Sequence, residues 1–195
     1  MKKTYFIKTF RINSCLFIIS ILSTMIRILL EIMSIFLFSE ANPNLTQYTQ
    51  FFKKYLLLFG NSLDKIILII IAILIFLILP ELVFRITKDS LLNYIKSYWI
   101  TFRLRKFLIK QTDYDNENEL KIQKHNLAIQ KSVIDIRNNN ILFIIKLPND
   151  HEIQRSITDT TDGLREEISS LFPCYVFSSF ERKKHLLVLE GTNFR

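Results

Sequence analysis

Glycine is scarce in this sequence, and its scarcity excludes a large class of nucleotide-binding proteins. The 195 residues include only three glycines, Gly60, Gly163 and Gly191, and these lie far apart. A P-loop or a dinucleotide-binding fingerprint needs two or three glycines within about eight residues, because the backbone must approach a phosphate closely. We therefore expect no nucleotide site built on a glycine-rich loop.

Cysteine and histidine are also rare. We expect no disulfide, because Cys15 falls in an apolar run and Cys174 in a predicted soluble domain, where a reducing compartment keeps it a thiol. The three histidines are isolated, no metal-ligand spacing occurs, and no nucleophile elbow is present. We therefore predict a protein that is not an enzyme, with no catalytic residue, no cofactor and no metal. The densest acidic group fits an exposed helix face, a metal or catalytic site being the alternative; it comprises Asp159, Asp162, Glu166 and Glu167.

Positive charge is distributed unevenly along the chain. Residues 1–112 contain 15 Lys or Arg against 5 Asp or Glu, whereas residues 113–195 contain 11 against 13. The excess positive charge therefore accompanies the longest apolar runs, which is typical of membrane proteins that follow the positive-inside bias. The mildly acidic remainder has no basic face, so we expect no direct nucleic-acid binding by the C-terminal domain.

The second apolar run predicts a transmembrane helix. Residues 66–79 contain no polar side chain, and the run extended to Phe84 covers 19 residues. As a helix these residues span roughly 28 Å, close to the hydrocarbon thickness of a bilayer. The buried helix of a soluble protein is the alternative, but such a helix normally carries a polar face.

The first apolar run, residues 15–38, includes two charged side chains, Arg27 and Glu31. An unpaired charge at mid-bilayer costs about 2.5–3.5 kcal/mol on insertion scales, and residues four apart share a helix face. We therefore predict an intramembrane ion pair between Arg27 and Glu31 at a helix–helix or oligomer contact; a functional polar site is the alternative. A cleaved signal peptide would have a shorter apolar region, usually about 7–15 residues.

Basic residues beside the two runs predict the orientation in the membrane. Four Lys or Arg precede the first run, three lie between the runs, and seven follow the second. These counts favour a multi-pass protein of the cell membrane with both termini in the cytoplasm. The predicted organisation is a basic N-terminus over residues 1–14, then a two-span transmembrane hairpin over residues 15–84 with an extracellular loop over residues 39–65.

A basic amphipathic helix is predicted over residues 85–110, directly after the second span. Its apolar residues recur at helical spacing; they are Leu91, Leu92, Ile95, Tyr98, Trp99 and Phe102. Tyr and Trp favour the headgroup level, and basic residues there are attracted by anionic lipid. We expect this helix at the membrane interface, a DNA-contacting helix being the alternative. The residues expected at the interface are Arg85, Lys88, Lys96, Tyr98, Trp99, Arg103, Arg105, Lys106 and Lys110.

An acidic linker over residues 111–126 and a small α+β domain over residues 127–195 are predicted to complete the chain. A strand over residues 132–137, a turn over residues 138–140 and a strand over residues 141–147 form a hairpin. Asn149 and Glu152 resemble a capping box before a helix that runs to Phe172, with a break near residues 160–163. Residues 175–181 and 185–191 form a second hairpin around residues 182–184. The predicted fold is thus a membrane α-helical hairpin plus a small C-terminal α+β domain of order ββαββ.

Residues 138–192, NNNILFIIKLPNDHEIQRSITDTTDGLREEISSLFPCYVFSSFERKKHLLVLEGT, carry a resemblance to a known family. With two spans and a basic juxtamembrane helix before it, this stretch resembles the N-terminal membrane region of FtsK/SpoIIIE-type conjugative coupling proteins of Gram-positive mobile elements. In that family a P-loop ATPase motor follows the small domain. No residue here matches a motor motif, so the resemblance implies a stand-alone accessory, a split subunit or a truncated remnant.

Three hypotheses for the function follow. The first is a non-enzymatic scaffold or accessory subunit in the membrane, in a conjugative DNA-transfer or related mobile-element machine. Its partners would be the lipid bilayer, copies of itself, and a motor ATPase or relaxosome protein. The second is a bacteriocin-immunity or toxin-defence membrane protein, in which the loop over residues 39–65 and the Arg27–Glu31 pair matter most. A sensor fragment is the third.

Overall fold

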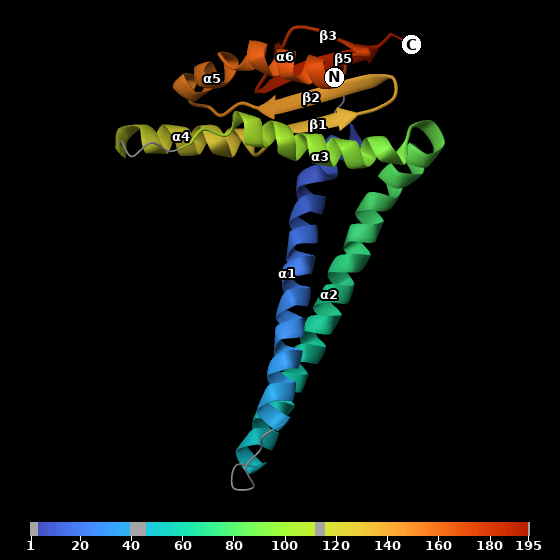
Figure 1. The fold of residues 1–195 in the computed structure, drawn as a ribbon, viewed down its shortest axis with the longest axis vertical. Coiled ribbons are helices and arrows are strands. Elements are labelled where there is room, and N and C mark those ends of the chain that lie inside the picture. The colour runs from blue at the N-terminus through green and yellow to red at the C-terminus, as the bar shows by residue number, and fades with distance from the viewer. Residues whose placement is uncertain (1–3, 40–45, 112–115, 195) are drawn as a thin grey trace. The chain divides into compact units, whose positions relative to one another are not determined.

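The computed structural model describes residues 4–39, 46–111 and 116–194 (Figure 1). The chain forms two compact units. The hairpin unit is Thr9–Glu81, and the α/β unit combines Met1–Lys8 with Leu82–Arg195. Each unit is described by itself below.

Two long apolar helices dominate the N-terminal half, as the sequence predicts. Helix α1 spans Tyr5–Ser39 and helix α2 spans Thr46–Lys88. Both are long and apolar enough to cross a membrane, by length and composition. Large apolar side chains such as Leu68 and Phe76 are exposed along them. A soluble monomer rarely exposes a contiguous apolar patch of more than a few hundred square ångströms.

Most of the predicted loop over residues 39–65 is helical. Helix α2 already begins at Thr46, so residues 46–65 form the N-terminal part of the helix that contains the second apolar run. The segment contains no proline and only one glycine, Gly60, and Leu, Lys and Gln are good helix formers. The hydroxyl of Ser62 donates to the Leu58 carbonyl at 2.9 Å, so a residue typical of loops is accommodated inside the helix. Residues 40–45 of the predicted loop lie outside the described residues.

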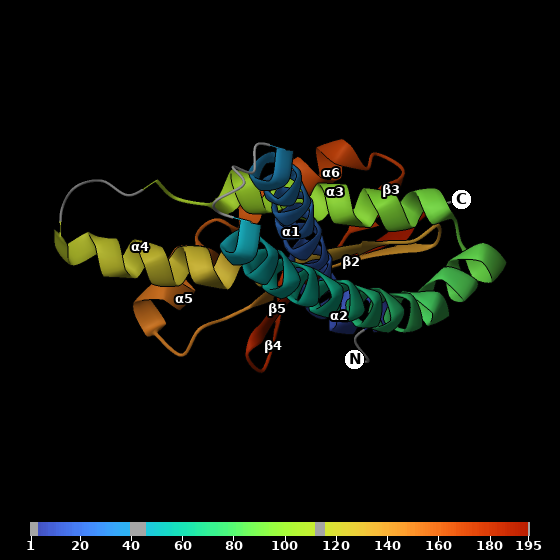
Figure 2. The same cartoon turned by 90° about the horizontal axis from the view of Figure 1, so that it is seen from below.

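The α/β unit contains one antiparallel sheet. Its strands are β1 Val133–Ile136, β2 Asn140–Lys146, β3 Tyr175–Phe177, β4 Glu181–Lys183 and β5 Leu186–Asn193. The order across the sheet is β1-β2-β5-β3 (Figure 1). Strand β4 pairs with the end of β5 opposite to the end that pairs with β3 (Figure 2). The helices are α3 Leu91–Leu108, α4 Asn116–Ile129, α5 His151–Thr158 and α6 Thr161–Leu171.

Strand β2 is apolar on both sides because the sheet is covered on both faces. Ile141, Phe143 and Ile145 point into the main core, which α3, α4, α5 and α6 complete. Leu142 and Ile144 point to the opposite face. There they form a small cluster with Val188, and Ile7 and Leu186 pack against it.

The domain matches the prediction in outline and differs in its element order. The predicted helix is divided into α5 and α6 by Asp159 and Thr160, at the start of the break expected near residues 160–163. Asp150, not Asn149, caps α5 by accepting from Glu152 N at 3.2 Å. The observed order of strands and helices after α4 is therefore ββααβββ.

The predicted second hairpin also differs in detail. Residues 182 and 183 belong to strand β4, and the turn lies at Lys184 and His185, where Lys184 has a φ of 60°. Strand β3 pairs with the far end of β5 instead of closing a hairpin with it. Residues 116–126 of the predicted linker are helical in α4 because its end, Ala128 and Ile129, is buried in the core; residues 112–115 lie outside the described residues.

Candidate functional site

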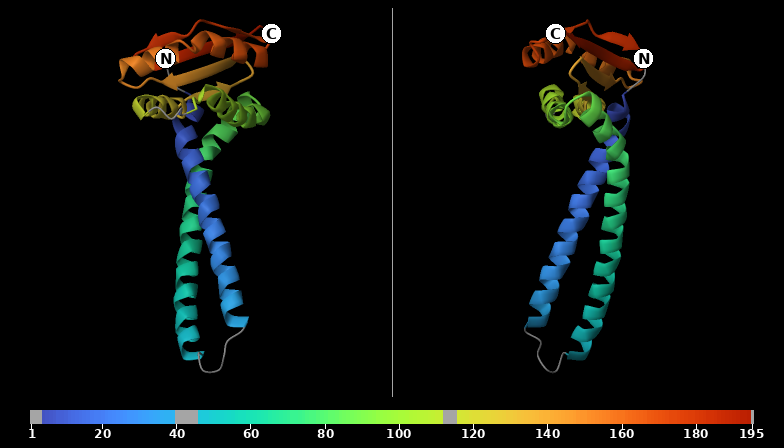
Figure 3. Two further views of the ribbon diagram at one scale, coloured as in Figure 1. Left: turned by 60° about the vertical axis from the view of Figure 1, so that its left-hand side comes forward. Right: turned by 90° about the vertical axis from the view of Figure 1, so that its right-hand side faces the viewer.

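Helix α3 lies along the outer edge of β1 (Figures 1 and 3) and satisfies its backbone groups. The Ile136 amide donates to Ser97 Oγ at 2.9 Å, and the Ile134 amide donates to Thr101 Oγ1 at 3.2 Å. Both hydroxyl side chains are fully buried. An exposed strand edge is a template for unwanted pairing, so α3 closes this edge of the sheet.

Arg105 extends this edge contact. Its Nε and Nη2 atoms donate to the Ser132 carbonyl at 3.0 and 2.7 Å. Burial lowers the pKa of Arg105 to about 10, which still leaves the guanidinium protonated at neutral pH. Arg105 therefore binds the domain itself, although the sequence predicts it at a lipid interface.

Arg85, at the end of α2, is the largest fully buried side chain of the described residues, with 0% of its surface exposed. It forms ion pairs with Asp89 and Asp135, and its Nη1 donates to the Ile136 carbonyl. Its guanidinium also lies 5.8 Å from the centroid of the Phe6 ring. A buried charge is tolerated only when it is paired and hydrogen-bonded, and Arg85 meets both conditions. The prediction that Arg85 faces lipid headgroups is therefore wrong.

Further polar side chains surround this pair of aspartates. Asp89 Oδ1 accepts from Asn93 Nδ2 at 2.9 Å and from the Asn138 amide at 2.8 Å, while Arg137 Nε lies 3.1 Å from Asp135 Oδ2. Two arginines thus balance two aspartates. We call Arg85, Asp89, Asn93, Asp135, Arg137 and Asn138 the Arg85 network. The network joins the last turn of α2 to the first turn of α3 and to the β1–β2 turn.

The first turn of α1 is also part of the α/β unit. Phe6 is 1% exposed, and its ring packs edge-on against Tyr94 and Tyr98 with centroids 5.5 and 5.3 Å apart. Ile7 packs against the small cluster on the second face of the sheet. The chain segments on both sides of the hairpin unit are therefore built into the core of one domain.

The outward side of α3 has a different character from its buried side. Leu92, Ile95, Trp99 and Phe102 are between 52% and 66% exposed and follow one another at helical spacing. Exposed basic residues accompany them; these are Lys88, Lys96, Arg103 and Lys106. We call these eight residues the α3 outer face.

The structure divides the nine residues that the sequence places at the interface into two groups. Five of them belong to the α3 outer face: Lys88, Lys96, Trp99, Arg103 and Lys106. The other four contact the domain: Arg85 and Arg105 as described, Tyr98 on Phe6, and Lys110, whose Nζ donates to Ser156 Oγ at 2.7 Å. Helical spacing alone does not show which basic side chains donate hydrogen bonds to the backbone of a neighbouring strand.

The ion pair within the hairpin unit has a third member. Arg27 Nη1 lies 3.7 Å from Glu31, and Arg27 Nε lies closer to Asp64, at 2.9 Å. Helical spacing does not predict the contact with Asp64, because Asp64 lies 37 residues from Arg27 and on the other helix. The available signal was a lone carboxylate beside an apolar run.

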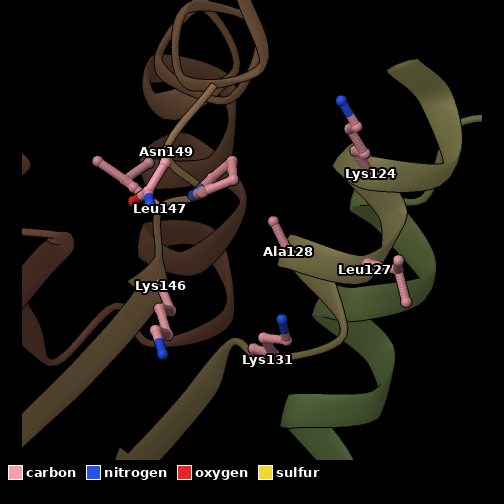
Figure 4. A pocket seen from close by; sticks show the side chains of 8 residues that line it. Lys124, Leu127, Ala128, Lys131, Lys146, Leu147 and Asn149 are labelled. Atoms are coloured by element: carbon pink, nitrogen blue, oxygen red, sulfur yellow. The ribbon is translucent and has the colours of Figure 1, made fainter. Parts of the chain in front are cut away.

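A cavity of about 310 Å³ lies between α4 and the segment after β2 (Figure 4). Lys124, Lys131 and Lys146 lie at its rim, and its apolar walls include Leu147. Lys124 Nζ is 3.3 Å from Asp150, and Figure 4 shows Lys124 and Lys146 pointing in opposite directions. The three ammonium groups do not converge on one point. Within residues 4–39, 46–111 and 116–194, no group of three His, Cys, Asp or Glu residues is placed to hold a metal.

His125 of α4 is buried between α3 and α5, and its burial leads us to expect that acid lowers the stability of the fold. Burial lowers the pKa of His125, the positive charge of Lys110 acts in the same direction, and a contact with the Leu108 carbonyl at 3.3 Å acts against it. Below about pH 6.5 the His125 imidazole takes up a proton more readily in the unfolded chain than in the folded chain. The free energy of unfolding therefore decreases as the pH is lowered. We expect His125→Gln to reduce the loss of thermal stability between pH 7.5 and 5.5.

The control for this prediction is the exposed His151, since His151→Gln leaves the buried imidazole in place. This variant should retain the pH dependence of the unmodified chain. Equal pH dependence in the His125→Gln variant and the unmodified chain would refute the assignment.

No protein-family model, curated protein or solved structure matches the chain.

Proposed function

We propose that the chain is a non-enzymatic, membrane-anchored scaffold or accessory subunit that holds a folded α/β domain at the membrane. The proposal rests on the burial of both flanks of the hairpin unit, Phe6 on one side and Arg85 on the other, within the α/β unit. The chain therefore connects the α/β unit to the hairpin unit at two points. Two connections of this kind suit a scaffold subunit that holds partner proteins at the membrane.

The proposed topology has two spans and places both termini and the α/β unit in the cytoplasm. Two helices that each span the membrane return the chain to the side of the membrane on which it started. Both flanks of the hairpin belong to one compact unit, which is consistent with that topology. The basic residues around the apolar runs favour the cytoplasmic side for this unit.

The proposed context is a conjugative DNA-transfer machine or a related machine of a mobile element. The resemblance of residues 138–192 to FtsK/SpoIIIE-type coupling proteins supports it. The partners would then be copies of the chain and a motor ATPase or relaxosome protein.

Crosslinking in native membranes, followed by purification of the chain, tests the scaffold proposal. We expect crosslinks to a second copy or to a motor or relaxosome protein. Recovery of a monomer without any crosslinked partner contradicts the proposal.

A bacteriocin-immunity or toxin-defence protein is the second candidate, favoured by the charged cluster of Arg27, Glu31 and Asp64 within the hairpin unit. Removal of residues 111–195 separates the two candidates. Immunity that depends on the hairpin should largely survive this deletion, whereas a scaffold should lose its partners.

A further inference from the structure

The α3 outer face combines exposed apolar residues with basic side chains. Leu92, Ile95, Trp99 and Phe102 lie near the middle of the exposed side of α3, while its opposite side is buried against the sheet. A surface helix of a soluble domain normally carries polar residues on its outward side. The outer face of α3 therefore needs an apolar environment that the described chain does not supply.

The charge of this face selects the kind of partner. Helix α3 contains no Asp or Glu, and Lys96, Arg103 and Lys106 are exposed along it. Arg103 lies 5.9 Å from the centroid of the Trp99 ring and shares its charge with Glu167 at 3.2 Å. A partner that offers an apolar layer beneath negative charges fits this pattern.

We propose that the α3 outer face lies in the plane of a membrane and binds anionic lipid headgroups, with its apolar side chains at the headgroup–acyl boundary. The proposal rests on the membrane anchoring proposed above and names the ligand of the adjoining helix. A helix surface that exposes both apolar and basic side chains binds membranes through buried apolar area together with attraction to anionic lipid.

Chain connectivity keeps the helix close to the bilayer. The predicted second span ends at Phe84, and α3 begins at Leu91. Seven residues reach no more than roughly 25 Å even when fully extended. The start of α3 therefore remains within reach of the headgroups on that side of the membrane.

DNA is a poorer fit to this face than lipid. Arginine is a frequent contact residue for both bases and phosphates in protein–DNA complexes. Two of the three arginines in residues 85–110 instead donate to backbone carbonyls of the domain, Arg85 to Ile136 and Arg105 to Ser132. Four of the eight residues of this face are apolar, and none of the eight has an amide or hydroxyl side chain that could read bases in a groove. Lipid therefore satisfies more of the exposed groups than a nucleic acid does.

Fluorescence of Trp99 tests the proposal, because it is the only tryptophan of the chain. The full chain is reconstituted into phosphatidylcholine vesicles with 30 mol% phosphatidylglycerol, and bromine quenchers are placed on the acyl chains of one lipid class at that same 30 mol%. We expect quenching of Trp99 by both brominated lipids, about twofold stronger for brominated phosphatidylglycerol. Lys96→Gln with Lys106→Gln should abolish this difference between lipids, and Ile95→Gln should weaken quenching by both.

A matched variant separates failure of this proposal from failure of membrane anchoring. Trp99→Phe with Phe76→Trp moves the only tryptophan into the second apolar run, where Phe76 is exposed. Quenching of this variant without quenching of Trp99 would overturn the α3 proposal and leave the anchor intact. Absence of quenching in both chains would overturn both. A salt-sensitive response of Trp99 to duplex DNA, with equal quenching by the two lipid classes, would overturn it in favour of nucleic acid.

Discussion

Replacement of Arg85 by methionine is expected to destabilise the α/β unit by about 3–5 kcal/mol. Methionine fills much of the same volume but leaves Asp89 and Asp135 buried, with side chains 2% and 1% exposed, and without their main cation. Removing one partner of a buried ion pair costs far more than removing a surface charge, because the remaining charge has lost water and its counter-ion. The free energy of unfolding is measured by urea unfolding in mild detergent, with the susceptibility of the α/β unit to proteolysis as the readout.

Two further variants make this prediction specific. Arg85→Lys keeps the charge but cannot supply the forked guanidinium geometry, so we expect an intermediate loss. Lys88→Met removes an exposed charge one turn away on the same helix and should change stability by no more than about 0.5 kcal/mol. A chain with Arg85→Met as stable as the Lys88→Met control would show that the Arg85 network does not hold the unit together.

Replacement of Gly191 by alanine is the second large expected effect. A Cβ atom at this position would lie 2.5 Å from Cε1 and 2.8 Å from Cδ1 of Phe177, the residue that pairs with Gly191 across β3 and β5. The Phe177 ring is buried in the main core and has little room to move. We expect a loss of about 1–3 kcal/mol, typical of overpacked cores, in the same urea unfolding experiment.

Gly163 provides the matched control for Gly191. A Cβ at Gly163 would meet no atom within 4 Å, and the residue lies within helix α6. Gly163→Ala should therefore stabilise the chain by up to about 1 kcal/mol through the higher helix propensity of alanine. Opposite signs at the two glycines are the expected result; equal effects would mean that the Phe177 contact does not constrain β5.

Periodicity predicts the elements whose burial pattern is local. The β1–β2 hairpin follows from two short apolar runs around Asn138–Asn140, and Ile153, Ile157, Leu164 and Ile168 are buried in the main core as their helical spacing predicts. The two long apolar helices follow from composition alone. These features depend on residues a few positions apart.

Features that depend on distant residues were not predictable from spacing. Arg85 reads as one more basic residue after a span, yet its partners Asp135 and Ile136 lie 50 and 51 residues away. Asp64 joins Arg27 from another helix for the same reason. The fifth strand was likewise not predicted, since β3 and β4 are only three residues each and pair with opposite ends of β5.

In the proposed topology, two spans hold the α/β unit on the cytoplasmic side of the membrane. The native Cys174 offers a direct test of this topology because the residue is exposed. With Cys15→Ser as background, a membrane-impermeant maleimide should label Cys174 only after the cells are permeabilised. A second chain, with Cys174→Ser and Asn44→Cys added to that background, should be labelled on intact cells. Labelling of Cys174 on intact cells, or protection of the introduced cysteine until permeabilisation, would contradict the proposed topology.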